Sequence, residues 1–170
     1  MVKLRVLISM ELEGVTNVQP ADDHYEYFFT DEYEISGSKG KASFVWRCSN
    51  CKKEHSANFL PSAAPPSKSK STSTSTSTST SKSTAPIPYT SSSSGQFSPF
   101  IALDCRGLEF TEFHFAGKWK AEGEESGAAF EIDWDELRKE QGGEERWDDY
   151  DEDGGMAVAV SELRSKIERA

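Results

Sequence analysis

Residues 2–12 alternate between apolar and polar side chains, and this period of two constrains the fold more than any other stretch of the chain. Every even position is apolar, whereas four of the five odd positions are polar or charged. The even positions are Val2, Leu4, Val6, Ile8, Met10 and Leu12. Because successive side chains of a strand point to opposite faces, the pattern predicts a strand with one buried face.

Short apolar and aromatic runs predict further strands in the second half of the chain. They cover residues 100–105, 109–115, 118–121 and 128–132. Glycines separate these runs at short intervals, which is typical of antiparallel strands joined by tight turns. The sequence therefore predicts a mainly β fold, with antiparallel strands in a sandwich-like or barrel-like arrangement.

Helix is expected in two short segments only. Residues 134–141 have the composition of about two helical turns, which two glycines at 142–143 would end. Residues 156–160 predict a short strand that leads into a last helical segment at 161–169. The reason is that Leu163 and Ile167 lie four residues apart, the spacing of neighbours on one helix face.

A perfect alternation of serine and threonine at residues 71–80 divides the chain. It lies within residues 61–96, which are rich in Ser, Thr, Pro and Lys. Such a stretch cannot bury enough apolar surface to offset the entropy lost on ordering, so we expect a disordered insertion. It separates an N-terminal β region, residues 1–60, from an acidic C-terminal β region, residues 97–170. The two regions are expected to pack as one unit.

Charge and cysteine content restrict the partners and the compartment. The net charge is −10, and residues 97–170 carry 9 basic and 20 acidic residues, which argues against nucleic acid as a partner. The apolar runs are too short for a membrane span. Three cysteines, an odd number, favour a reducing compartment over a disulfide framework. We expect a cytoplasmic monomer, with the nucleus as a second compartment, that binds an unidentified protein partner.

Cys48 and Cys51 form the motif that bears most directly on chemistry. Two thiols separated by two residues can bind one metal ion or form one reversible disulfide. Residues 43–48 have strand character and residues 55–60 are expected to be the returning strand, so the pair is predicted on a zinc-knuckle-type hairpin. Such a turn presents both sulfurs on one side of the backbone, which favours zinc.

The rest of the chain supplies few further metal ligands. A closed structural zinc site has four ligands, and outside the pair the chain offers one cysteine, Cys105, and three histidines. His55, four residues after Cys51, is a candidate third ligand. Two other interpretations of the pair stay open. It is either a redox dithiol, although no helix is indicated after it to lower a thiol pKa, or a pair of structural cysteines.

Other candidate residues have simpler interpretations. Cys105 follows an apolar strand and is expected in the core, where cysteine is often found. His24 and His114 are expected to be packing or surface residues. Residues 149–154 match the first half of a calcium loop, but its twelfth position is Val160 instead of glutamate, so a solvated acidic turn is expected. The sequence has neither a nucleophile elbow nor a phosphate-binding loop, and we expect no enzyme.

Four motifs, in this order, give the chain a resemblance to a known family. They are Gly40-Lys41-Ala42-Ser43 leading to Cys48-Ser49-Asn50-Cys51, then Asp104-Cys105-Arg106-Gly107-Leu108-Glu109, Ala121-Glu122-Gly123-Glu124-Glu125-Ser126-Gly127 and Trp147-Asp148-Asp149-Tyr150-Asp151-Glu152. The chain resembles the eukaryotic CXXC-motif-containing zinc-binding proteins over nearly everything outside the Ser/Thr insertion. This resemblance implies a mainly β fold and a structural zinc held by two CxxC pairs.

The chain departs from this pattern after Thr30. In the family, a first CxxC pair and a further strand follow there, whereas here the sequence continues directly into residues 31–34. Cys48 and Cys51 alone inherit the ligand role, so zinc is expected to bind weakly, or by sharing between two molecules. The leading functional hypothesis is a non-enzymatic binding or adaptor module. The alternatives are a thiol-disulfide oxidoreductase that uses the same pair, and a protein that binds a basic partner through its acidic half.

Overall fold

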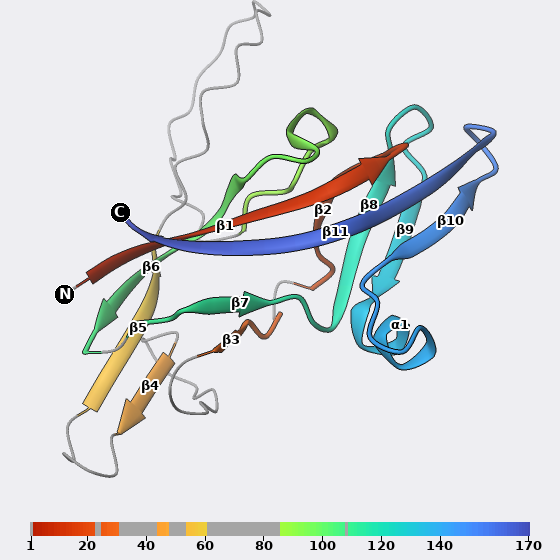
Figure 1. The fold of residues 1–170 in the computed structure, drawn as a ribbon. Coiled ribbons are helices and arrows are strands. Elements are labelled where there is room, and N and C mark those ends of the chain that lie inside the picture. Colours follow the sequence, from red (N-terminus) through yellow and green to blue (C-terminus); the bar gives the residue numbers. More distant parts are fainter. Residues whose placement is uncertain (1, 23–24, 31–43, 48–53, 61–85, 108) are drawn as a thin grey trace, which may run out of the picture.

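The computed structural model describes residues 2–22, 25–30, 44–47, 54–60, 86–107 and 109–170. Strands dominate this part of the chain, and one α-helix and one short 3-10 helix accompany them (Figure 1). The elements are β1 (Val2–Glu13), β2 (Val15–Pro20), β3 (Phe28–Thr30), β4 (Phe44–Arg47), β5 (Glu54–Leu60), η1 (Ser91–Ser93), β6 (Ser98–Arg106), β7 (Glu112–His114), β8 (Lys118–Gly123), β9 (Ala129–Asp133), α1 (Trp134–Glu140), β10 (Trp147–Asp151) and β11 (Met156–Arg169).

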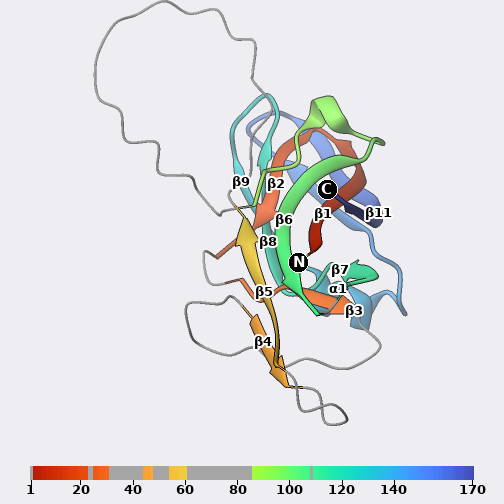
Figure 2. The ribbon, with the colours of Figure 1, turned by 90° about the vertical axis from the view of Figure 1, so that its left-hand side faces the viewer.

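The largest sheet has six antiparallel strands in the order β10-β11-β1-β6-β5-β4. Its centre is β1, which pairs with the last strand, β11, from Leu4 opposite Arg169 to Glu13 opposite Ala159. A three-stranded sheet, β2-β8-β9, and the β3-β7 pair complete the described part of the fold. The sheets curl into an open half-barrel (Figures 1 and 2). The predicted mainly β, antiparallel, barrel-like fold is therefore confirmed.

The core lies inside the curl of the sheets. Leu4, Val6, Ile8 and Met10, which are even positions of β1, are 0–1% exposed. Val2 and Leu12 at the two ends of the same series are partly buried against the core. The prediction that residues 2–12 form a strand with one buried face is therefore confirmed.

Helix α1 forms where the sequence predicts it. The carboxylate of Asp133 caps its N-terminus, because Oδ1 accepts hydrogen bonds from the backbone N–H groups of Asp135 and Glu136, each at 3.1 Å. Two glycines with positive φ, at 142–143, follow its end. The 7-residue helix buries Trp134. None of the helices in the described residues is long and apolar enough to cross a membrane.

The prediction of a helical segment at the C-terminus is wrong. Residues 156–169 form one continuous strand, β11, which pairs with β1 along most of its length. Ile167 lies opposite Val6, and Ser165 lies opposite Ile8. A spacing of four residues fits a period of two as well as a helical period. A nine-residue helix is marginal by itself, so the long ladder with β1 decides the conformation.

The predicted disordered insertion extends too far toward the C-terminus. Residues 61–85 lie outside the described residues, but residues 86–96 are part of the fold. Tyr89 is 1% exposed and forms a β-bridge with Val18 of β2. Its hydroxyl contacts three backbone carbonyls, those of Met10 at 3.1 Å, Gln96 at 2.8 Å and Ser93. One buried aromatic side chain with a hydrogen-bonded hydroxyl therefore orders a segment that is otherwise poor in apolar residues.

Tyr89→Phe is expected to lower the free energy of unfolding by about 1–3 kcal/mol, because it removes the hydroxyl donor shared by the three carbonyls and changes no apolar packing. The Met10 and Ser93 carbonyls keep the backbone N–H groups of Gly95 and Gln96 as donors, so the loss falls mainly on the Gln96 carbonyl. Urea denaturation followed by fluorescence measures the change. Tyr150→Phe is the matched control, because Tyr150 is 55% exposed, and it should change stability by less than about 0.5 kcal/mol. Equal effects of the two substitutions would contradict the role assigned to the Tyr89 hydroxyl.

Candidate metal centre

Strands β4 and β5 form the hairpin that was predicted to carry the cysteine pair. They pair antiparallel, from Phe44 opposite Ala57 to Arg47 opposite Glu54, and β4 is an edge strand of the six-stranded sheet. Residues 48–53 join the two strands, and Cys48 and Cys51 lie in this connection, outside the described residues. The hairpin lies at one end of the molecule (Figures 1 and 2). The two flanking strands are thus confirmed, whereas metal binding by the cysteines stays a prediction.

His55 lies at the start of β5, close in sequence to the cysteines. In the ladder it is opposite Trp46 of β4. A Cβ atom built on Gly107 would lie 2.7 Å from Cε1 of His55 and still closer to Nδ1. The Nδ1 edge of the ring is therefore turned toward the backbone at the end of β6. As a candidate third ligand, His55 has its other ring nitrogen, Nε2, on the edge away from this contact.

The third cysteine does not extend the motif. Cys105 of β6 is 0% exposed and belongs to the core cluster, which confirms the prediction of a core cysteine. It lies between Val2 of β1 and Ala57 of β5. Ala57 is three residues along β5 from Glu54, a distance of about 10 Å at the usual rise of a strand. The Cys105 thiol is therefore a packing group, separated from the hairpin connection.

Other metal-binding side chains do not converge within the part of the chain that the structure describes. No group of three or more His, Cys, Asp or Glu residues there has an arrangement that could hold a metal ion. His114 is exposed on β7, in agreement with its prediction as a surface residue. His24 lies outside the described residues. Within the described residues the structure therefore offers no alternative to the predicted cysteine site.

The acidic segment with half of a calcium-loop pattern runs from the end of β10 into the turn before β11. Asp151, which is at position three of the pattern, is 1% exposed and points inward. Its Oδ2 accepts a hydrogen bond from the Ser126 hydroxyl, and its Oδ1 accepts one at 3.0 Å from the backbone N–H of Gly154. The solvated acidic turn that the sequence predicts is therefore corrected at Asp151, which is buried.

Asp151 joins two of the motifs on which the family resemblance rests. Ser126 belongs to the turn between β8 and β9, and Asp151 belongs to the end of β10. The hydrogen bond from Ser126 lowers the pKa of Asp151, and the backbone N–H of Gly154 lowers it further, whereas burial acts in the opposite direction. Gly123 makes room for the pair, since a Cβ there would lie 2.6 Å from Oδ2 of Asp151. Sequence reasoning missed this contact, although Gly123 in the motif at residues 121–127 was a signal of close approach.

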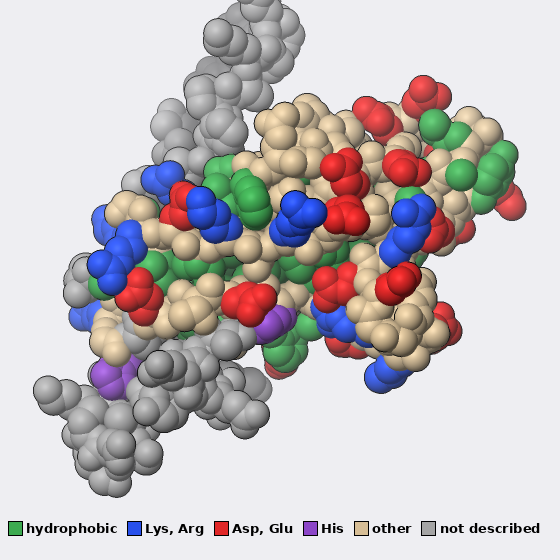
Figure 3. Space-filling model, in the orientation of Figure 1, with side chains coloured by type: hydrophobic (Ala, Val, Ile, Leu, Met, Phe, Trp, Pro, Cys, Tyr) green, Lys and Arg blue, Asp and Glu red, His purple; other side chains and the backbone are tan. Residues whose placement is uncertain are grey.

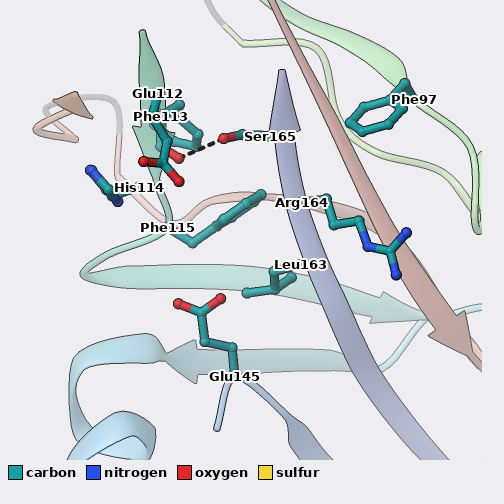
Figure 4. A pocket seen from close by; sticks show the side chains of 9 residues that line it. All are labelled: Phe97, Glu112, Phe113, His114, Phe115, Glu145, Leu163, Arg164 and Ser165. Carbon is teal, nitrogen blue, oxygen red and sulfur yellow. Dashed lines mark hydrogen bonds between the residues drawn. The ribbon is translucent and has the colours of Figure 1, made fainter. Parts of the chain in front are cut away.

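A groove of about 380 Å³ opens between β7 and β11 (Figure 4). Phe113, Phe115 and Leu163 give it an apolar lining. Figure 3 shows a strip of hydrophobic side chains across this face of the molecule, with charged side chains on either side of it. The Ser165 hydroxyl donates a 2.7 Å hydrogen bond to the Phe113 carbonyl and ties the two strands together. The described lining residues include charged ones, such as Glu112, and none of them belongs to β5. The groove and the predicted metal hairpin are therefore separate features.

Comparison with known sequences places these features in a family. The profile described as CXXC motif containing zinc binding protein, eukaryotic, matches residues 29–168. The CXXC motif containing zinc binding protein of Homo sapiens is 25% identical over 180 aligned residues, which cover 95% of this chain and 94% of the relative. A UPF0587 protein of Schizosaccharomyces pombe is 27% identical over 197 aligned residues, which cover 99% of both chains.

Solved structures share the same fold. The crystal structure of C1orf123 superimposes with a TM-score of 0.70 at 23% identity, covering 99% of each chain. A hypothetical protein from Plasmodium falciparum superimposes with a TM-score of 0.65 at 21% identity, covering 99% of this chain and 100% of the other. The profile match extends from β3 to β11 and includes the cysteine pair. This chain therefore belongs to the eukaryotic family of CXXC motif containing zinc binding proteins.

Proposed function

We propose that this protein is a non-enzymatic binding or adaptor module with a weakened zinc site, in which Cys48 and Cys51 are the ligands. The family supports zinc as the metal, since zinc binding is part of its description. The observation that carries the weakened site is the burial of Cys105. The chain has three cysteines, and the one outside the pair is 0% exposed in the core.

The number of thiolates sets the expected affinity. Sulfur donors fit zinc, but a closed structural site uses four ligands, and one copy of this chain has two thiols besides that of the buried Cys105. Each missing thiolate removes binding energy that would also hold the hairpin in place. We therefore expect the zinc affinity to be lower by several orders of magnitude than that of a four-thiolate site. Two copies that face each other with their hairpins would restore four thiolates.

Metal analysis of the purified protein tests this proposal. After gel filtration, the monomer should retain well below one zinc per chain, and any zinc-loaded species should elute as a dimer. Cys48→Ser combined with Cys51→Ser should abolish the residual binding, because a serine hydroxyl does not replace a thiolate. The control is Cys105→Ala, which should leave zinc binding unchanged. One tightly held zinc in each monomer would overturn the proposal.

The same cysteines also allow a test of the non-enzymatic assignment. Two ordinary thiols should titrate near their usual pKa of about 8.5 and should be protected from alkylation by added zinc. A thiol-disulfide oxidoreductase would instead show one thiol of low pKa and would turn over a disulfide substrate. Alkylation rates measured against pH, with and without zinc, separate these outcomes. Disulfide turnover that is lost in the Cys48→Ser variant would reject the adaptor assignment.

A further inference from the structure

Gly107 lies directly across the sheet from the His55 ring. The ladder between β5 and β6 ends with Ser56 opposite Arg106. His55 and Gly107 are the next opposing positions in that register, one step closer to the connection at residues 48–53. A Cβ on Gly107 would be 2.7 Å from Cε1 of His55 and 3.2 Å from its Cγ. The imidazole therefore occupies the space that any other side chain at 107 would fill.

The backbone at this position would also resist substitution, but that effect can be separated from the ring contact. Gly107 has a φ of +78°, a conformation that glycine adopts without strain. Gly127 has a similar φ of +70°, and a Cβ there would meet nothing within 4 Å. The two glycines thus share the backbone requirement and differ in the aromatic ring, which makes Gly127 a matched reference.

The position of the contact suggests what it does. Within the described residues, β4 pairs with β5 alone, and the other edge of β5 pairs with β6. The β5–β6 ladder stops at Ser56, so His55 lies between the last pair of that ladder and the connection that carries the cysteines. An aromatic side chain that covers a glycine across a strand pair is a known way of fixing sheet register. The contact is thus placed to hold the end of the hairpin against β6.

We propose that the His55 ring packs on the backbone of Gly107 and that this packing contact positions the β4–β5 hairpin. His55 is then a positioning residue, and the glycine of the segment Asp104-Cys105-Arg106-Gly107 is required for its fit. The consequence for zinc rests on the proposed function, because a hairpin that moves relative to the sheet presents Cys48 and Cys51 less often in one arrangement. The structural part of the proposal is independent of zinc.

Four variants test the packing of the His55 ring on Gly107: Gly107→Ala, His55→Ala, the two combined, and Gly127→Ala. Amide hydrogen exchange is measured with a chelator present, so that no metal contributes. Gly107→Ala should raise exchange in β5 about tenfold, whereas β1 and β11 stay protected, because only the hairpin opens more often. Gly127→Ala should leave exchange in β5 unchanged.

The combined variant carries the decisive comparison. Once His55 is alanine, the ring is absent, and adding Gly107→Ala should raise exchange in β5 by clearly less than it does with the ring present, because only the backbone cost of the positive φ remains. If Gly107→Ala has the same effect on exchange with and without the His55 ring, or no larger effect on β5 than Gly127→Ala, the proposed His55–Gly107 contact is rejected. Zinc affinity, measured separately by competition with a colorimetric chelator, should fall in Gly107→Ala. If the unmodified protein binds no zinc, the proposed function fails, while the exchange result still tests the His55–Gly107 contact.

Discussion

Trp119→Ala is expected to lower the free energy of unfolding by about 3–5 kcal/mol, the usual effect of removing a large buried aromatic side chain. Trp119 is 0% exposed and lies on β8, the middle strand of the three-stranded sheet. Its ring stacks on Phe100 with centroids 5.5 Å apart and an interplanar angle of 21°, and it meets Tyr25 edge-on at 5.8 Å. Phe100 belongs to the six-stranded sheet, so Trp119 packs the two sheets together.

The indole N–H adds a polar contact to this packing. It donates to the Tyr25 hydroxyl at 3.1 Å and to the Ala116 carbonyl at 3.2 Å. Trp119→Phe keeps an aromatic ring and loses the donor, so it should fall between the native protein and Trp119→Ala. Urea denaturation followed by circular dichroism gives the three values. Phe28→Ala is the control, because Phe28 is 45% exposed, and a loss comparable to that of Trp119→Ala there would contradict the assigned role.

The strands whose side chains alternate strictly could be predicted from the sequence. Residues 2–12 show a period of two because one face of β1 meets the core along its whole length. The strands around the cysteine pair and the helix beginning at Trp134 could also be predicted, because local signals such as the Asp133 cap and the following glycines define them. In these segments the local preference and the tertiary environment agree.

The conformation of the C-terminal segment could not be predicted in the same way. Leu163 and Ile167 satisfy both a helical and a strand period, so the pattern does not distinguish between them. The deciding interaction is the ladder with β1, whose partners lie more than 140 positions away in the sequence. Tyr89 is a similar case, because its hydroxyl bonds to carbonyls of β1 and of the loop around η1, which the local sequence does not reveal.

The contacts at the candidate site are also long-range. His55 and Gly107 are 52 positions apart, and Ser126 and Asp151 are 25 positions apart. The sequence reveals that glycines occur in these motifs, but it does not reveal which side chain each glycine admits. The cysteine pair is different, because its chemistry depends on two thiols three positions apart, and so it could be recognised from the sequence.

Asp151→Asn is expected to destabilise the fold strongly at neutral pH, although it is nearly isosteric. Both carboxylate oxygens accept hydrogen bonds, one from Ser126 and one from the Gly154 backbone. An amide keeps one acceptor oxygen and turns an NH₂ group toward the other donor, so one donor always loses its partner. A side chain at either neighbouring glycine is also excluded, because a Cβ added at Gly123 or Gly154 would lie 2.6 or 2.8 Å from Oδ2 of Asp151.

The pH dependence of this effect identifies its cause. The hydrogen bonds lower the pKa of folded Asp151 below the ordinary value of 3.8, which applies to the unfolded chain. The carboxylate therefore stabilises the fold fully above that value, and its contribution is lost as the pH falls through the folded pKa. Urea midpoints of the native protein and Asp151→Asn should differ by a constant amount between about pH 5 and pH 7 and should converge in acid. Asp149→Asn, at an exposed carboxylate two residues earlier, is the control and should change the urea midpoint much less at neutral pH. A difference between the native protein and Asp151→Asn that persisted unchanged into strong acid would mean that packing, and not the charge of Asp151, holds the two turns together.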